Sequence, residues 1–214
     1  MKKIITITLL AVFTTFVYSA QRQTGWQKDN LKGKVKELTK SSYRIRDTSV
    51  SIIKIIEKKT IFKYDKKGNK IEERYYNAND SLDYAWFYKY DINGNIIELK
   101  ITKSDGTVES KTIYIYDRNG NNSEQDYYYA SGTLGSKTIY RYDSNNNVII
   151  KEYINANNSY STKTVYEYDN RGNIVKEALF NAEGSLLFKQ IYKYDKLGNK
   201  IEESSFLQGN DSLY

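Results

Sequence analysis

The sequence contains no cysteine, no histidine and no proline, and its one methionine is the initiator. Without cysteine and histidine the chain can form no disulfide, no thiolate nucleophile, no zinc site with sulfur or nitrogen ligands and no imidazole acid–base pair. A lipid anchor on an N-terminal cysteine is excluded for the same reason. Proline removes a ladder hydrogen bond from a strand, so its absence is consistent with a chain that is nearly all β-sheet.

The charged residues show no long run of one sign. The 214 residues have a net charge of +7, and the first twenty contribute two lysines and no acid. The other 31 basic and 26 acidic residues are mixed along the chain, with no block of five like charges. This pattern is typical of a solvated surface, so we expect no nucleic-acid partner.

The first residues have the layout of a secretory signal peptide. Lys2 and Lys3 precede an apolar run over residues 4–17, and the small residue Ser19 follows it. We therefore predict a signal peptide over residues 1–19 and export to the periplasm, the cell surface or the medium. The alternative is an uncleaved anchor, but the run is shorter than the ~20 residues that a helix needs to span a bilayer. No other stretch is long enough, so we do not expect an integral membrane protein.

A four-residue motif recurs six times with a spacing of 26 residues. The copies are FKYD at 62–65, YKYD at 88–91, YIYD at 114–117, YRYD at 140–143, YEYD at 166–169 and YKYD at 192–195. Six copies without an insertion or deletion indicate a structural repeat, in which each unit stacks on its neighbour in the same way.

Each motif opens a turn with the pattern Asp-x-x-Gly-Asn. Asp at the first position and Gly at the fourth are typical of a type I turn, because the Asp side chain bonds the backbone two residues on and the Gly takes a left-handed conformation. In the fourth copy Asn146 takes the position of the glycine. The predicted turn-forming residues are Asp65, Gly68, Asp91, Gly94, Asp117, Gly120, Asp143, Asp169, Gly172, Asp195 and Gly198.

A second turn lies twelve residues after each Gly, so turns alternate at intervals of 12 and 14 residues. This spacing leaves strands of about 7–9 residues and no room for the crossover that parallel neighbours need. We predict an all-β fold, an antiparallel meander of repeated hairpins with about 13 strands that forms one long twisted or curling sheet. A β-solenoid with one coil per unit is the alternative.

The regions outside the 26-residue frame differ from the repeats. Residues 20–32 are predicted to be a polar linker, and residues 33–64 a longer hairpin that caps the first repeat. The repeats fill residues 65–214, where the last unit is incomplete. We expect the cap and the repeats to form a single domain.

The two tyrosines of each motif are two residues apart and therefore share one face of the sheet. This face is aromatic, whereas the other is charged with one apolar stripe. We expect the rings to pack along the repeat axis and the hydroxyls to reach water. The alternative is an exposed platform for sugars or a partner chain. The candidate residues of this platform are Tyr88, Tyr90, Tyr114, Tyr116, Tyr140, Tyr142, Tyr166 and Tyr168.

The run YxYDxxGN, repeated with a Gly/Asn turn between copies, resembles the YD repeats of the RHS family from Phe62 to about Phe206. Large members of that family wind many such repeats into a shell around a toxin domain, and related surface proteins use them for adhesion. Six copies are too few for a shell. The resemblance therefore implies a small, stand-alone exported bacterial member with a β-repeat architecture.

We expect a non-catalytic binding or scaffold module with a glycan or protein ligand and no cofactor or metal. An immunity or antitoxin-like partner protein is an alternative suggested by family analogy alone. A secreted hydrolase using Glu72, Glu98, Glu124 and Glu202 is a further alternative, but that chemistry needs one pair of carboxylates across a cleft. Turn loops such as residues 91–95 lack the dense acids of a calcium site. The identity of the ligand and the oligomeric state stay open.

Overall fold

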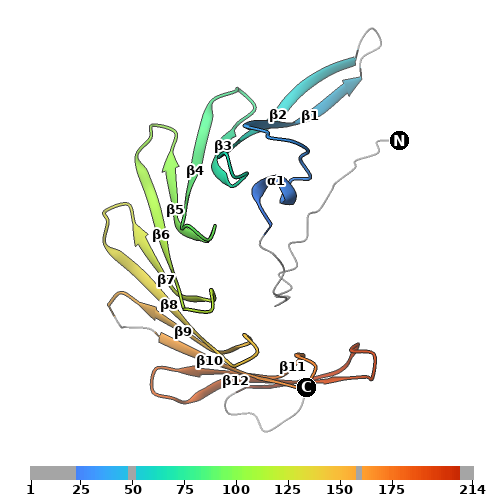
Figure 1. Cartoon of the computed structure of the whole chain (residues 1–214), viewed down its shortest axis with the longest axis vertical. Coiled ribbons are helices and arrows are strands. Elements are labelled where there is room, and N and C mark those ends of the chain that lie inside the picture. Colours follow the sequence, from blue (N-terminus) through green and yellow to red (C-terminus); the bar gives the residue numbers. More distant parts are fainter. Residues whose placement is uncertain (1–22, 48–51, 158–160, 208–214) are drawn as a thin grey trace.

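The computed structural model describes residues 23–47, 52–157 and 161–207. The predicted signal peptide and residues 208–214 of the incomplete unit lie outside these ranges. The described chain forms one sheet of 13 strands and a short helix (Figure 1). The elements are α1 (Gly25–Lys28), β1 (Glu37–Asp47), β2 (Ile52–Tyr64), β3 (Lys70–Tyr76), β4 (Leu82–Tyr90), β5 (Ile96–Lys103), β6 (Val108–Tyr116), β7 (Asn122–Tyr129), β8 (Leu134–Tyr142), β9 (Val148–Asn155), β10 (Ser161–Tyr168), β11 (Ile174–Asn181), β12 (Leu186–Tyr194) and β13 (Lys200–Leu207).

The strands follow one another across the sheet in chain order, from β1 to β13. Each pair is antiparallel; Tyr88 of β4, for instance, pairs with Leu99 of β5 rather than with a residue 26 positions away. The predicted antiparallel meander is therefore confirmed, and the β-solenoid alternative is wrong. The short connections explain this result, because they join neighbouring antiparallel strands but are too short for parallel crossovers.

Each motif turn closes its hairpin through the same hydrogen bonds. In the first turn the amide of Gly68 donates to the carbonyl of Asp65 at 3.1 Å, and the Asp65 carboxylate accepts from the amides of Lys67 and Asn69. The corresponding amide-to-carbonyl bonds of the other five turns measure 3.0 or 3.1 Å. Gly68 has a φ of +86° and Asn146 one of 64°. Both angles lie in the left-handed region, which glycine and asparagine adopt at lower cost than other residues.

The sheet bends into an open arc with a concave and a convex face (Figure 1). A register shift recurs at the second tyrosine of each motif, for instance between Lys89 and Tyr90 and between Arg141 and Tyr142. Such bulges bend a strand and increase its right-handed twist. Because they recur in every 26-residue unit, we attribute the continuous curvature of the meander to them.

The helix α1 lies on the concave side of the arc at its N-terminal end (Figure 1). Thr24 and Gln27 form a capping box at its start. The backbone amide of Trp26 donates to the carbonyl of Gly68 at 3.1 Å, and its indole donates to the carbonyl of Val35 at 2.6 Å. The prediction of a polar linker over residues 20–32 therefore needs correction in its described part. These bonds hold the segment against the first motif turn.

Few side chains are buried, because one sheet has no second layer over most of its area. The buried apolar residues of the described chain are Phe62, Tyr64, Ala85 and Ala178. Three of these four belong to β2 and β4, close to the N-terminal end. Within the described ranges, no helix has the length and hydrophobicity required to cross a membrane.

Candidate functional site

From the second motif onward, the second tyrosine of the motif donates a hydrogen bond through its hydroxyl to a backbone carbonyl of the preceding unit. The hydroxyl of Tyr90 donates to the carbonyl of Lys70 at 2.6 Å, twenty residues earlier. Equivalent bonds join Tyr116 to Ile96 at 2.8 Å, Tyr142 to Asn122 at 2.7 Å, Tyr168 to Val148 at 2.8 Å and Tyr194 to Ile174 at 2.9 Å. The expectation that the hydroxyls reach water is wrong for these residues. The acceptor carbonyls lie at the bulges, where the ladder is disrupted and leaves a backbone oxygen to be satisfied.

The first tyrosine of each motif is partly buried on the same face. Burial raises the pKa of Tyr140, and burial together with the neighbouring Tyr116 and Tyr140 phenols raises the pKa of Tyr114. For Tyr88, burial and the nearby Glu73 carboxylate raise the pKa, and that carboxylate accepts from the Tyr88 hydroxyl at 2.8 Å. These phenols are therefore neutral at physiological pH and present rings and hydroxyls rather than charge.

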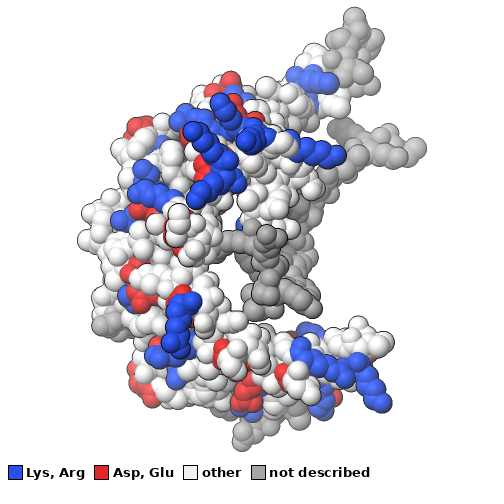
Figure 2. All heavy atoms as spheres, viewed as in Figure 1, with Lys and Arg blue, Asp and Glu red and all other residues white. Residues whose placement is uncertain are grey.

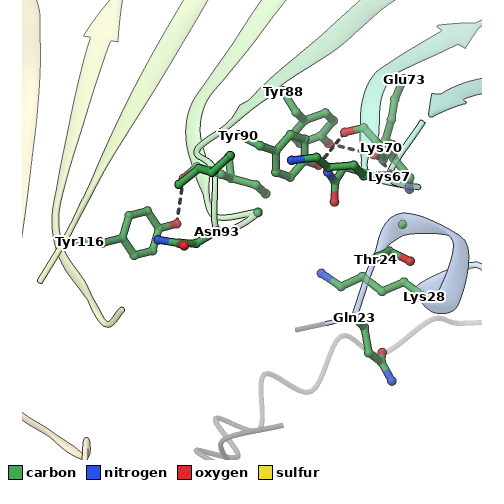
Figure 3. A pocket seen from close by; sticks show the side chains of 15 residues that line it. Gln23, Thr24, Lys28, Lys67, Lys70, Glu73, Tyr88, Tyr90, Asn93 and Tyr116 are labelled. Carbon is green, nitrogen blue, oxygen red and sulfur yellow. Dashed lines mark hydrogen bonds and ion pairs between the residues drawn. The ribbon is translucent and has the colours of Figure 1, made fainter. Parts of the chain in front are cut away.

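The eight candidate tyrosines occupy equivalent register positions in four successive units, so they form one row along the same face of the sheet. Burial, reinforced by the neighbouring Tyr140, raises the pKa of Tyr142 to about 12. Burial, reinforced by the neighbouring Tyr166, has the same effect on Tyr168. Figure 3 shows Tyr88, Tyr90 and Tyr116 on the side of the sheet that faces α1. The structure thus brings the predicted platform residues together, at one pair per repeat unit.

A cleft separates α1 from the first two motif turns (Figure 3). Its volume is about 490 Å³. We call it the α1 cleft. Its principal lining residues are Lys28, Lys67, Lys70, Glu73, Asn93, Tyr88, Tyr90 and Tyr116. The cleft therefore joins the N-terminal end of the tyrosine row to charged side chains from α1 and from the first turn.

The charges of the α1 cleft do not cancel. The ammonium group of Lys70 lies 3.3 Å from Asp29 and 3.3 Å from Glu73, so its charge is compensated. Lys28 and Lys67 also line the cleft, and both side chains are exposed. Neither forms an ion pair with the described part of the chain. The cleft thus carries two uncompensated positive charges.

Asp29, which ends α1, is the hydrogen-bond acceptor for the tyrosine of the first motif. Its carboxylate accepts from the Tyr64 hydroxyl at 2.7 Å and pairs with Lys40 at 3.1 Å. Burial acts to raise the pKa of Asp29, but the hydrogen bonds from Tyr64 and Lys40 and the charge of Lys70 outweigh it and lower the pKa. Asp29 is therefore ionised and takes the place that a backbone carbonyl fills in the later units.

The charge of the chain is distributed unevenly between its two parts. Residues 23–70 contain 14 Lys and Arg against 5 Asp and Glu, a net charge of +9. Residues 71–214 contain 16 basic and 21 acidic residues, a net charge of −5. Figure 2 shows many basic side chains at the end of the molecule formed by the N-terminal strands. The α1 cleft therefore lies in the basic part of the protein.

The repeated carboxylates considered for hydrolysis are paired with cations across neighbouring strands. Glu72 lies 3.2 Å from Lys63, Glu98 2.8 Å from Lys89 and Glu202 2.9 Å from Lys193. Glu124 pairs with Lys137. None of the four lines the α1 cleft. The structure thus gives them an electrostatic role within the sheet, and hydrolysis stays a hypothesis.

The described ranges contain no group of three or more carboxylates that could hold a metal ion. The turn aspartates use their oxygens within the turn. In the second turn, for example, the Asp91 carboxylate accepts from the backbone amide of Asn95 at 2.7 Å and from its side-chain amide at 2.6 Å. These bonds assign the loop carboxylates to turn formation.

Sequence reasoning missed the α1 cleft and its residues Lys28, Lys67 and Glu73. Two signals in the sequence could have indicated its parts, a helix and a basic region, although not the way in which they meet the tyrosine row. The pattern from Thr24 to Gln27 matches a capping box and predicts a helix start. The basic excess of residues 23–70 marks the same region as one suited to an anionic partner.

No protein-family model and no curated protein sequence matches this chain. Solved structures with a similar arrangement include a chain of the Photorhabdus luminescens Tc holotoxin pore, at 11% identity and a TM-score of 0.28. That similarity covers 83% of this chain and 14% of the other, so the chain spans a small part of the toxin subunit's length. A porin-like protein from Bacteroides uniformis is similar at 9% identity and a TM-score of 0.46, over 85% of this chain and 83% of the other. Similarities at this level establish no family and no function, and the likeness to YD repeats stays a resemblance.

Proposed function

We propose that this chain is an exported, non-catalytic binding module whose ligand lies on the concave face. The observation that carries the proposal is the continuous row of paired tyrosines on that face. Among the described residues, α1 is the element that lies over this row, and it does so at one end (Figure 1). Neutral phenols with fixed rings provide broad, amphipathic contact area at a low entropic cost, which suits a glycan or a protein surface.

The signal-peptide pattern of residues 1–19 supports export, and an exported module would meet its ligand in the periplasm, at the cell surface or in the medium. The hydrogen bonds of Tyr90, Tyr116, Tyr142 and Tyr168 also stabilise the arc. The tyrosines therefore serve both the curvature of the sheet and the surface that it presents. A test of binding must leave them intact.

The absence of cysteine allows the two faces to be blocked separately. Lys151 pairs with Tyr140 and is exposed on the concave face, whereas Arg141, between Tyr140 and Tyr142, is exposed on the convex face. Lys151→Cys and Arg141→Cys would each be coupled to a polyethylene glycol maleimide. Mature protein would then be applied to arrays of bacterial surface glycans and of peptides.

We expect binding on one array, with an affinity that falls at least about tenfold when the polymer is attached on the concave face. The matched convex conjugate should bind as the parent does. Equal blocking by both conjugates, blocking by the convex conjugate alone, or no binding on either array would contradict the proposal.

A further inference from the structure

We infer that the α1 cleft binds an acidic saccharide, a sugar whose carboxylate lies between Lys28 and Lys67. The inference rests on the proposed function, because it names a ligand class for one end of the concave face. It rests on three observations about the cleft: its charge, its aromatic lining and its size.

The charge of the cleft selects an anion. Lys28 comes from α1 and Lys67 from the first motif turn, so the two cations belong to opposite walls (Figure 3). Lys70 is held by Asp29 and Glu73 and contributes no free charge. The surrounding residues 23–70, with a net charge of +9, add a field of the same sign. A ligand carboxylate between Lys28 and Lys67 would compensate both.

The lining of the cleft selects a sugar rather than a bare inorganic anion. Tyr88, Tyr90 and Tyr116 contribute rings, and Asn93 contributes an amide with donors and an acceptor. The hydroxyls of all three tyrosines already donate, to Glu73 and to the carbonyls of Lys70 and Ile96, so the rings are held in place before the ligand arrives. Fixed rings beside polar groups suit the apolar face and the hydroxyls of a pyranose.

The size of the cleft is appropriate for part of an oligosaccharide. Its volume of about 490 Å³ lies within the range of roughly 300–1,000 Å³ that is usual for small-molecule sites. Tyr116 belongs to the next repeat unit after Tyr90, so the aromatic lining continues onto the concave face. An acidic peptide would use the same lysines, but it would gain less binding free energy from the tyrosine rings. The test below distinguishes binding of such a peptide from binding of a saccharide.

The test measures binding of mature full-length protein by calorimetry with three probes. The first is tri-galacturonic acid, the second is its methyl ester, and the third is a penta-glutamate peptide. The double variant Lys28→Gln/Lys67→Gln removes the two cations of the cleft. Its matched control is Lys32→Gln/Lys66→Gln, which removes the same charge from exposed neighbours that do not line the cleft.

We expect the trisaccharide to bind the parent and the control equally, and the double variant at least about tenfold more weakly. The methyl ester should bind the parent about as weakly as the acid binds the double variant. Equal affinity for acid and ester, or equal losses in both double variants, would overturn the inference. So would binding of the penta-glutamate peptide without the trisaccharide, or binding of neither. None of these results depends on the face-blocking experiment, so the proposed function can stand when the saccharide site fails.

Discussion

The first and the last copy of the motif occupy equivalent positions in the repeat but differ in burial. At the N-terminal end Phe62 is 8% exposed and Tyr64 is 5% exposed, and the α1 segment lies beside them. In β12, near the other end of the sheet, the equivalent residues of the last motif, Tyr192 and Tyr194, are only partly buried. The comparison shows that the repeat by itself forms hydrogen-bonded strands, whereas burial of its side chains depends on a second layer.

The same contrast applies to the tyrosine hydroxyls. In later units the second tyrosine donates to a carbonyl of the preceding unit, as Tyr142 does to Asn122. Tyr64 belongs to the first motif and donates instead to the carboxylate of Asp29. The α1 segment therefore supplies, from a different kind of residue, the acceptor that a preceding repeat would have supplied.

The largest effect on stability is expected in the first motif turn, which Trp26 covers, and it can be compared with the second motif turn, which is open. Gly68 and Gly94 both have left-handed backbones, with φ of +86° and +80°. A Cβ at Gly68 would lie 2.5 Å from the Trp26 ring, whereas one at Gly94 would meet nothing within 4 Å. Gly94→Ala should cost about 1–2 kcal/mol of unfolding free energy through backbone strain. Gly68→Ala should cost about 4 kcal/mol, because it also displaces Trp26. Urea unfolding measures both, and equal losses would show that Trp26 contributes nothing.

The next largest effect on stability is expected for Tyr140, in the middle of the tyrosine row. Tyr140 is partly buried. Tyr140→Ala should lower the free energy of unfolding by about 3 kcal/mol, as expected for truncating a packed aromatic ring. Tyr140→Phe retains the ring and should cost less than about 1 kcal/mol. Thermal melts distinguish the two variants. An alanine variant as stable as the parent would assign the tyrosines to binding rather than to packing.

A smaller effect on stability is expected from removing a tyrosine hydroxyl, and its size should depend on whether the acceptor is a carboxylate or a backbone carbonyl. Tyr64→Phe removes a hydrogen bond to an ionised carboxylate and should cost about 2 kcal/mol, whereas Tyr142→Phe removes one to a backbone carbonyl and should cost about 1 kcal/mol. The free energies of unfolding of both variants, measured at neutral pH, test this order. The reverse order would show that Asp29 is a poorer acceptor than the carbonyl.

The pH dependence of stability identifies the role of Asp29. Because its pKa is lower in the folded protein than the ordinary value of 3.8, its ionisation stabilises the fold at pH values above about 4. This contribution should be lost as the pH falls below that value, through the pKa of the folded state. Asp29→Asn should abolish this component of the acid transition while leaving the rest unchanged. An unaltered pH profile in the variant would contradict the assignment.

The smallest effect is expected on the convex face. Glu98 pairs with Lys89 at 2.8 Å, and the lysine side chain is 67% exposed. Because solvent screens such a pair, Glu98→Gln should cost less than about 1 kcal/mol, and added salt should reduce the difference. Urea unfolding at low and high salt measures this. A loss as large as that of Tyr140→Ala would show that the carboxylate row, rather than the tyrosine row, stabilises the sheet.

Most of the fold could be derived from local pattern. The 26-residue spacing and the Asp-x-x-Gly-Asn turns sufficed for the strand number, the antiparallel meander and the alternation of tyrosines with charged residues. These features depend on short-range rules, the turn geometry and the period of two residues in a strand, which hold whatever the rest of the chain does. The predicted tyrosine row was accessible for the same reason, because residues in register share a face.

Three features depended on tertiary structure. The docking of α1 involves contacts of Trp26 with Gly68 and of Asp29 with Tyr64, which are 42 and 35 residues apart in the chain. The hydroxyls of the second tyrosines donate to carbonyls at the bulges of the preceding unit, as Tyr90 does to Lys70. The α1 cleft forms where the docked α1 segment lies opposite the first two motif turns and the tyrosines of the concave face. Local periodicity specifies which face a residue occupies, but the meeting of distant segments depends on shape and packing, and no short-range pattern in this sequence encodes it.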